Sequence, residues 1–457
     1  MTEPMRCRRP LHRAGGRPWL ILAVVAGLLA GCTPHLGLYP KIEELARAGQ
    51  YEAAAAFVEK NRAEYGDRNA VLYHLDRGLL LHYAGRYAES NRDFEAAERR
   101  MDELFTESVS GHALAFALND NTLPYRGEDF ETVVVNLYRA LNYVQLGQVD
   151  EAIVEARKVN LKLERINAQY AEGEKNVYKE DAFARLLAGV LYEMGGTRDD
   201  VNDAFISDRL AVKAYRQDFA HNYNVQVPDA LARNLLTTAE FMGAEETAEA
   251  RKQFPAVEPI PLVRKQEQGQ LYFVHFAGRS PVKVEDAIRA QMLDGNLLKI
   301  AFPRYKPSYY VVNGARFVRG GEVLATLEPA QPLGAIAVEN LDNRKGRIAV
   351  KAIARATAKY LANKALQERA KKESQSTQLL AFVAGTVFTE VSEQADLRSW
   401  RTLPDRVLIG RAMLPPGKHV LQAQFLTGGT NVVGTRDLGE VEVAAGQTRF
   451  LILHTLQ

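Results

Sequence analysis

Cysteine is almost missing from this chain: only Cys7 and Cys32 occur among 457 residues. Both lie near the N-terminus, so the rest of the sequence has no thiol for a disulfide bond, a thiolate metal site or a nucleophile. An excess of charge of one sign is lacking too, because 58 basic residues face 56 acidic ones. A chain so balanced has no global attraction to nucleic acid, and we exclude nucleic acid as a partner.

Signatures of common enzymes are missing as well. The sequence contains no Gly-x-Ser-x-Gly, His-Glu-x-x-His or Gly-x-x-x-x-Gly-Lys-Ser/Thr motif. The nine histidines are scattered, and no acid or cysteine completes a ligand set with His74 and His82, which share a helix face. We therefore predict that the protein is not an enzyme and holds no metal and no cofactor.

The N-terminus has the layout of a secretory leader. Arginines precede an uncharged apolar run, Trp19 to Leu29. As a helix this run is roughly 16 Å long, too short to cross a hydrocarbon core of about 30 Å. Its end, formed by Leu29, Ala30, Gly31 and Cys32, resembles the lipobox of bacterial lipoproteins. The resemblance implies removal of residues 1–31 and acylation of Cys32; an ordinary secretory signal with a chance cysteine is the alternative.

The lipobox resemblance also implies a location. Several acyl chains on one cysteine hold a protein firmly at a membrane surface. Thr33 stands where an aspartate favours retention at the inner membrane. The resemblance thus implies an outer-membrane protein that faces the periplasm, with the inner membrane as the alternative. We expect residues 32–41 to form a lipid-anchored tether.

Residues 42–254 contain a recurring helical pattern in which Gly-x-Tyr or a close variant is followed by small residues. Gly49, Gly85 and Gly147 begin the clearest copies. A glycine at these positions suits the tight turn between two helices, and a small residue such as Gly78 lets the paired helices approach closely. The pattern resembles the tetratricopeptide (TPR) repeat and predicts an α-solenoid with a concave surface. A generic helical bundle is the alternative.

Polar residues on two of these helices predict a groove that binds a partner. Asn136 and Arg139 lie on one predicted helix, and Glu155 and Arg157 lie on the next. Such side chains can hold an extended peptide by hydrogen bonds and ion pairs. The alternative is a solvated helix face with internal charge pairs.

The second half changes in composition near Pro255, and we predict a linker over residues 255–267. Residues 268–405 combine short strands with a long helical run, and residues 406–457 have the spacing of a β module. The predicted fold class is therefore multidomain α + β. It comprises an N-terminal TPR-like α-solenoid, a mixed α/β region and a C-terminal β-sandwich-like module.

The long helical run has an apolar part and a basic part. The apolar part, Leu379 to Phe388, spans only ten residues, so we predict a buried core helix rather than a membrane span. The basic part places Lys351, Arg355, Lys359 and Lys364 close to one face. We expect a solvated face there, with attraction to anionic lipid or glycan as the alternative.

A short loop before the C-terminal strands contains Asp396, Arg398 and Trp400. Trp400 is the only tryptophan outside the leader. We predict that these residues form a clasp between domains, with the tryptophan buried. The alternative is a recognition patch, since Trp and Arg are favoured at binding hot spots.

Taken together, the lipobox, the Leu141-to-Arg157 stretch and the Asp396-to-Pro404 loop resemble an uncharacterised family of Gram-negative TPR-containing lipoproteins. The resemblance implies an architecture and no catalytic residue. The function we expect is a lipid-anchored periplasmic scaffold that binds envelope proteins and takes part in envelope assembly. A protein that binds peptidoglycan or lipopolysaccharide is the second hypothesis.

Overall fold

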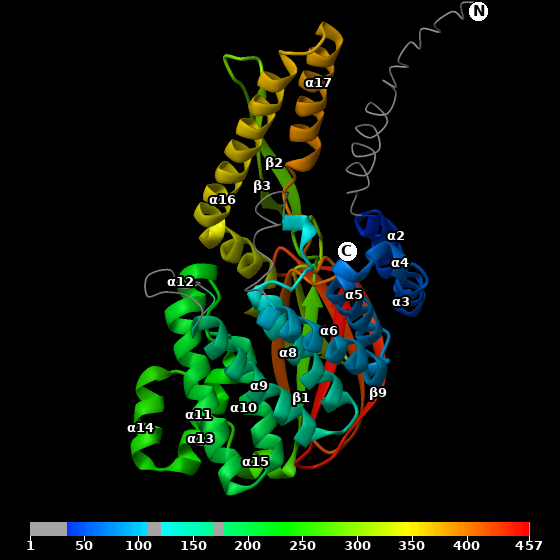
Figure 1. The fold of residues 1–457 in the computed structure, drawn as a ribbon. Coiled ribbons are helices and arrows are strands. Elements are labelled where there is room, and N and C mark those ends of the chain that lie inside the picture. The colour runs from blue at the N-terminus through cyan, green and yellow to red at the C-terminus, as the bar shows by residue number, and fades with distance from the viewer. Residues whose placement is uncertain (1–33, 108–119, 169–177, 179, 457) are drawn as a thin grey trace, which may run out of the picture.

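Helices form the first half of the chain, and strands enter only after residue 268, so the fold is mixed α and β (Figure 1). The computed structural model describes residues 34–107, 120–168, 178 and 180–456. The leader and the lipobox residues Leu29, Ala30, Gly31 and Cys32 lie outside these ranges. Among the described helices, none is long and apolar enough to cross a membrane.

The helical layer consists of consecutive pairs joined by short turns. The main helices are α2 (Tyr39–Arg47), α3 (Tyr51–Lys60), α5 (Ala70–Tyr83), α6 (Tyr87–Glu107), α8 (Asp129–Gln145), α9 (Val149–Ala168), α10 (Ala182–Gly195), α11 (Arg198–Ala214), α13 (Asp229–Met242) and α14 (Ala244–Gln253). Shorter segments connect them: α4 (Arg62–Tyr65), η2 (Asp67–Asn69), η3 (Asp120–Thr122), a π-helical turn η4 (Tyr215–Phe219) and α12 (Ala220–Tyr223).

The glycines expected at the inter-helix turns adopt the conformation that the pattern predicts. Gly49, Gly85 and Gly147 have φ of 73°, 76° and 74°, a region that side chains with a Cβ rarely enter. Gly78 lies inside α5, where a Cβ would come within 2.9 Å of the Phe94 ring on α6. The small residue is therefore required for the close approach of this helix pair.

Strands from both ends of the second half form the first sheet. Its order is β10 (Thr448–Thr455), β1 (Gly269–Ala277), β7 (Arg406–Leu414) and β6 (Glu328–Gln331). β1 runs parallel to β10, with Phe273 beside Leu451, and antiparallel to β7. The predicted boundary between residues 268–405 and 406–457 is therefore wrong, because both segments contribute strands to one sheet.

The second sheet repeats this mixing. Its order is β5 (Glu322–Thr326), β4 (Gly314–Arg319), β8 (Gly417–Thr427) and β9 (Asn431–Val443). An apolar core fills the space between the sheets, where the ring of Phe273 on β1 stacks on that of Phe317 on β4 at 3.8 Å between centroids. The two sheets thus share one core across the predicted boundary.

β1 is the centre of a three-layer arrangement of helices, first sheet and second sheet. All nine of its residues are buried. Side chains alternate along a strand, so Leu271 and Phe273 face the second sheet while Tyr272, Val274 and Phe276 face the helices. On the helix side, the ring of Tyr138 on α8 lies 5.0 Å from that of Phe276. This face of the helical layer is therefore covered by the chain's own sheet.

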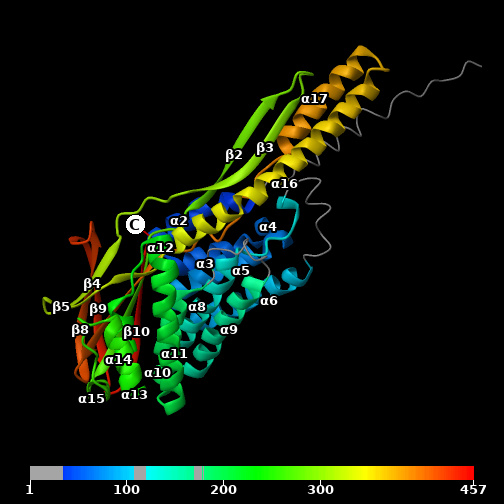
Figure 2. The same ribbon diagram turned by 90° about the vertical axis from the view of Figure 1, so that its left-hand side faces the viewer.

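Four elements form a projection that leaves this body, visible in both views (Figures 1 and 2). They are the hairpin of β2 (Val282–Gln291) and β3 (Leu297–Lys306), and the helices α16 (Leu333–Ala370) and α17 (Gln375–Ser392). At 38 residues, α16 is about 57 Å long. We call residues 282–306 and 341–392 the arm.

Two connecting segments differ from expectation. The predicted tether over residues 32–41 is wrong in its described part, because η1 (Pro34–Leu38) and the start of α2 are folded and bury His35 and Tyr39. The predicted linker over 255–267 contains a short helix, α15 (Leu262–Glu267), in which Lys265 is buried. Pro34 and the residues that follow it are therefore already part of the folded body.

Candidate functional site

Three of the four residues predicted to line a groove meet in one buried network, and the fourth, Arg157, lies apart. Asn136, Arg139 and Glu155 are buried in an ion network that joins α6, α8 and α9. Asn136 Nδ2 donates to Glu98 Oε1 at 3.0 Å and to Glu155 Oε2 at 2.6 Å, and Arg139 Nη2 lies 3.1 Å from Glu155 Oε1. Arg139 also pairs with Glu98. The network ties three helices together, and its Arg139 and Glu98 also line a charged cavity of about 730 Å³ between α6 and α9.

The charge of the network is balanced internally. Burial would raise the pKa of Glu98, but Lys162, Asn136 and Arg139 outweigh burial and hold this pKa at about 2. Arg157, the fourth predicted groove residue, lies apart from the network. Its side chain is exposed and its Nε donates to the Tyr192 hydroxyl on α10 at 3.1 Å.

The loop that contains Asp396, Arg398 and Trp400 is pinned between the helical layer and the sheet. Arg398 is buried; its Nη1 donates to the Leu123 carbonyl at 2.8 Å, its Nη2 donates to the Asp120 carbonyl at 3.1 Å, and Asp396 Oδ2 lies 2.7 Å from Nη2. One guanidinium thus satisfies two backbone acceptors of the segment before α8. This is the geometry that the clasp hypothesis requires, and the buried Arg398 offers no recognition surface.

Trp400 lies at the centre of the junction. Its side chain is 1% exposed, with the ring of Phe94 on α6 at 5.8 Å and the ring of Tyr138 at 6.0 Å between centroids. Its backbone N–H donates to Glu131 Oε1 on α8 at 2.8 Å. Burial, followed by the neighbouring Glu128, raises the pKa of Glu131 to about 7.

A second buried acid, Asp76 on α5, accepts a hydrogen bond from Thr402 of the same loop. Tyr39 and Tyr65 donate to its Oδ2 at 2.8 Å and 2.9 Å, and the Thr402 hydroxyl donates to its Oδ1 at 2.8 Å. Burial raises the pKa of Asp76 to about 6 although these hydrogen bonds oppose the shift. Sequence reasoning missed this residue, and its signal was an acid on an otherwise apolar helix segment.

The basic stripe on α16 faces largely inward rather than to solvent. Arg355 and Lys359 are buried against Glu393, whose Oε2 lies 3.1 Å from Arg355 Nε and 2.8 Å from Lys359 Nζ. Lys351 is half-buried, and its Nζ lies 2.5 Å from Asp120 Oδ1. The prediction of a solvated face is wrong for Arg355 and Lys359 and holds fully only for Lys364, which is exposed.

The apolar part of α17 was predicted to be buried, but it is largely exposed. Leu379, Leu380 and Val383 were predicted to be core residues, yet they are 65%, 61% and 49% exposed. Only Gly385, Thr389 and Ser392 of this helix are buried. The helix is therefore packed along one narrow stripe and presents apolar side chains elsewhere.

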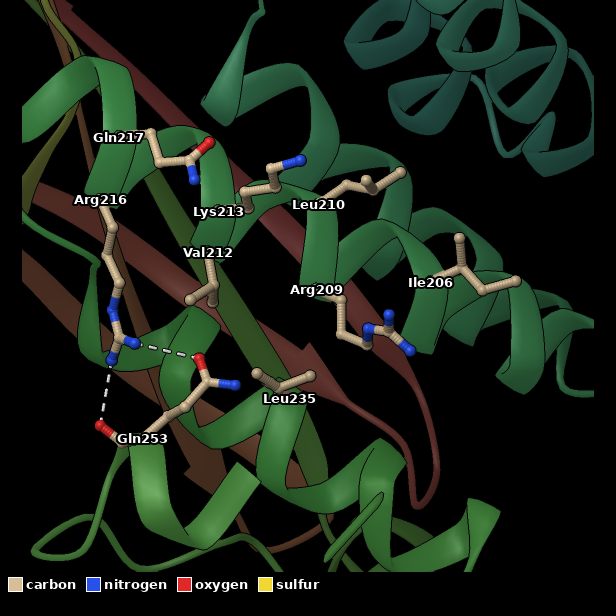
Figure 3. A pocket seen from close by; sticks show the side chains of 9 residues that line it. All are labelled: Ile206, Arg209, Leu210, Val212, Lys213, Arg216, Gln217, Leu235 and Gln253. Carbon is tan, nitrogen blue, oxygen red and sulfur yellow. Dashed lines mark hydrogen bonds between the residues drawn. The ribbon is translucent and has the colours of Figure 1, made fainter. Parts of the chain in front are cut away.

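A basic cavity of about 450 Å³ opens on the outer side of the helical layer, between α11, η4, α13 and α14 (Figure 3). Ile206, Leu210, Val212 and Leu235 give it apolar walls. Three cations line it: Arg209, Lys213 and Arg216. Arg216 is held by Gln253, whose Oε1 and backbone oxygen each accept a bond at 3.0 Å (Figure 3).

The other two cations of this cavity are not neutralised. Within the described ranges, no carboxylate lies within ion-pair distance of Arg209 or Lys213; the Arg209 guanidinium lies over the Phe205 ring at 5.4 Å. The charged cavity between α6 and α9 differs, because its Lys162 and Glu98 pair at 2.7 Å. The cavity at α11 can therefore receive a ligand that combines negative charge with apolar groups.

The described part of the chain contains no group of three or more His, Cys, Asp or Glu side chains that could hold a metal ion.

Comparisons with known proteins identify no family. No family model matches the chain, and no curated protein matches it. One solved structure that it resembles is BtubC (BKLC) from P. vanneervenii, at 13% sequence identity and a TM-score of 0.27. The match covers 54% of this chain and 96% of that one. A likeness this low carries no argument about function.

Proposed function

We propose that this protein is a lipid-anchored scaffold of the bacterial outer membrane that faces the periplasm and acts by binding an envelope protein. The observation that carries the proposal is a lipobox-like segment, Leu29 to Cys32, that is followed from Pro34 on by residues of the folded body. Acyl chains on Cys32 would place the body directly at the membrane surface, since His35 and Tyr39 are already buried in that body.

The helical layer is TPR-like in this proposal. Support comes from the helix pairs, from the positive φ of Gly49, Gly85 and Gly147, and from the Gly78–Phe94 contact. The face that packs on β1 is filled, however, so the partner has to bind on another face. The cavity at α11 is the surface whose chemistry favours a partner, because its apolar walls carry unneutralised cations. We propose that an acidic, partly apolar segment of an envelope protein binds there.

Cell fractionation tests the anchor. The parent chain should fractionate with outer membranes, and Cys32→Ala should lose this behaviour while it keeps its leader. If parent and variant fractionate alike with uncut leaders, the scaffold has no lipid anchor and the proposal fails.

A photo-cross-linking residue placed at Leu210 tests the cavity in living cells. We expect a discrete adduct from this position that disappears when Arg209→Glu and Lys213→Glu are combined. The matched control is a cross-linker at Val432 on β9, also exposed, together with Lys418→Glu. An adduct that survives the charge reversal removes the cavity from the proposal. An adduct to peptidoglycan or lipopolysaccharide instead of protein replaces the envelope protein by a glycan ligand.

A further inference from the structure

Exposed apolar side chains concentrate on the arm. Of 25 large hydrophobic residues that are exposed in the described ranges, 11 belong to the arm. They are Ile288, Leu293, Val350, Ile353, Leu361, Leu366, Leu379, Leu380, Phe382, Val383 and Val387. Such a concentration on one projection marks a surface that contacts something else.

The helix α17 has a narrow inner stripe and a broad outer face. On the inner side, Asn363 Nδ2 of α16 donates to the Gly385 carbonyl at 3.0 Å and to Thr389 Oγ1 at 2.8 Å. The outer face carries Leu379, Leu380 and Val383, which lie on adjoining turns. No described part of the chain covers this outer face, so its apolar side chains are open to a partner.

The arm holds a fixed orientation, which a surface-binding device needs. Its root contains the buried Arg355–Glu393 and Lys359–Glu393 pairs. Further out, the β2–β3 turn is fastened to α16, because Asn296 and Gln367 exchange hydrogen bonds of 3.0 Å and 2.6 Å. Leu293 in this turn is fully exposed, beside the α17 face, since Gly295 lies close to Phe382.

Two observations favour a lipid bilayer over a protein as the occupant. The first is position: α2, which follows the lipobox closely, lies at the end of the molecule from which the arm projects, and α14 and α15 lie at the other end (Figures 1 and 2). The second is charge. The exposed end of the arm carries Lys364, Arg369, Lys371 and Lys372 against Glu368, Glu373 and, in the β2–β3 turn, Asp294, a small basic excess that attracts anionic headgroups.

We propose that the outer part of α17 and the β2–β3 turn insert into the headgroup–acyl boundary of the bilayer that holds the Cys32 lipid. The inference rests on the proposed function only for the identity of that bilayer. Only residues 379–388 of α17 form an apolar run, about 15 Å of helix, so α17 lies along the interface with its apolar face downward rather than spanning the membrane. Insertion gives the body a second attachment and thereby fixes its orientation.

A fluorophore at residue 380 tests this proposal on the acylated protein. Once the leader is removed and Cys32 is acylated, Leu380→Cys provides the only free thiol, and it sits at an exposed position. The labelled protein is placed in vesicles of phosphatidylethanolamine and phosphatidylglycerol. We expect a blue shift of emission and loss of most of the emission when the acyl chains are brominated. Val432→Cys on β9 is the matched control and should show neither change.

Each other outcome overturns the proposal. Emission at residue 380 that is quenched only by aqueous iodide means that the arm stays in water. A blue shift that grows with protein concentration and ignores brominated lipid means that a second copy covers the arm. Dye uptake by the parent chain, which keeps Leu380, would reveal a free Cys32; that result defeats the proposed lipid anchor and is distinguished from failure of the arm.

Discussion

The strand β1 buries its apolar side chains, whereas the helix α17 leaves most of its apolar side chains exposed. All nine residues of β1 are buried between the helical layer and the second sheet, whereas α17 buries only three of its 18 residues. The body therefore completes its own core with segments from the whole chain. The arm has buried ion pairs at its root and leaves apolar side chains exposed further out. Four substitutions test whether this contrast between body and arm is real.

Trp400→Ala should have the largest effect, because it removes the largest side chain at the junction of helices and sheet. We expect a loss of about 3–5 kcal/mol in the free energy of unfolding, measured by urea denaturation with far-ultraviolet circular dichroism. Helical and strand signals should shift together in one transition. Trp400→Phe is the control and should cost less. Two separate transitions in the parent would contradict a shared core.

Glu393→Gln should come next, since it removes the buried carboxylate that Arg355 and Lys359 share. Breaking a buried pair in this way costs about 3 kcal/mol or more. Glu368→Gln removes the partner of Lys371 in an exposed pair on the arm and should cost under about 1 kcal/mol. Equal losses of unfolding free energy in the two variants would show that the root of the arm is not the buried, rigid element described above.

The pH dependence of the free energy of unfolding should show that the His82 imidazole is buried in its neutral form. Burial lowers the pKa of His82 to about 4 although Asn142 opposes the shift, so the unfolded chain binds this proton first as pH falls below 6.5. The free energy of unfolding that the neutral His82 side chain contributes therefore falls by about 2 kcal/mol as the pH drops from 7 to 5. His82→Gln should therefore become more stable relative to the parent over that range. A constant difference between the two unfolding free energies would contradict a neutral buried imidazole.

Leu380→Ser should have the smallest effect, within about 0.5 kcal/mol, because the side chain already faces solvent in the isolated protein. Leu271→Ala on β1 is the matched comparison and should cost about 2–5 kcal/mol. Thermal unfolding in the absence of lipid measures both. A large loss for Leu380→Ser would mean that α17 packs against the chain more tightly than its exposure indicates.

Local patterns sufficed for the helical first half, for the turns at Gly49, Gly85 and Gly147, and for a buried tryptophan in the loop before the last strands. Each of these features depends on residues close by in the sequence, so the spacing of apolar residues and the conformational freedom of glycine are enough to predict it. The pairing of β1 with β10 joins residues about 180 positions apart in the chain. Local sequence patterns do not show which distant strands pair, so the predicted boundary at residue 405 separates strands that belong to one sheet.

Charge was the other source of error. Arg139, Glu155, Arg355 and Lys359 were expected at the surface because isolated charges seldom enter a core. Arg139 pairs with Glu98 and Glu155, and Arg355 and Lys359 pair with Glu393; these partners come from other helices or loops, and only the folded chain brings them together. For α17 the composition suggested a core, but the arm offers this helix a single neighbouring helix to pack on.

The central claim is that residue 32 carries lipid and thereby holds the body at a membrane. Mass spectrometry of the N-terminal peptide, taken from protein extracted from bacterial membranes, measures this directly. The account predicts a peptide that begins at Cys32 and carries the mass of several acyl chains. A peptide that begins at Met1, or one that contains an unmodified Cys32, would contradict it.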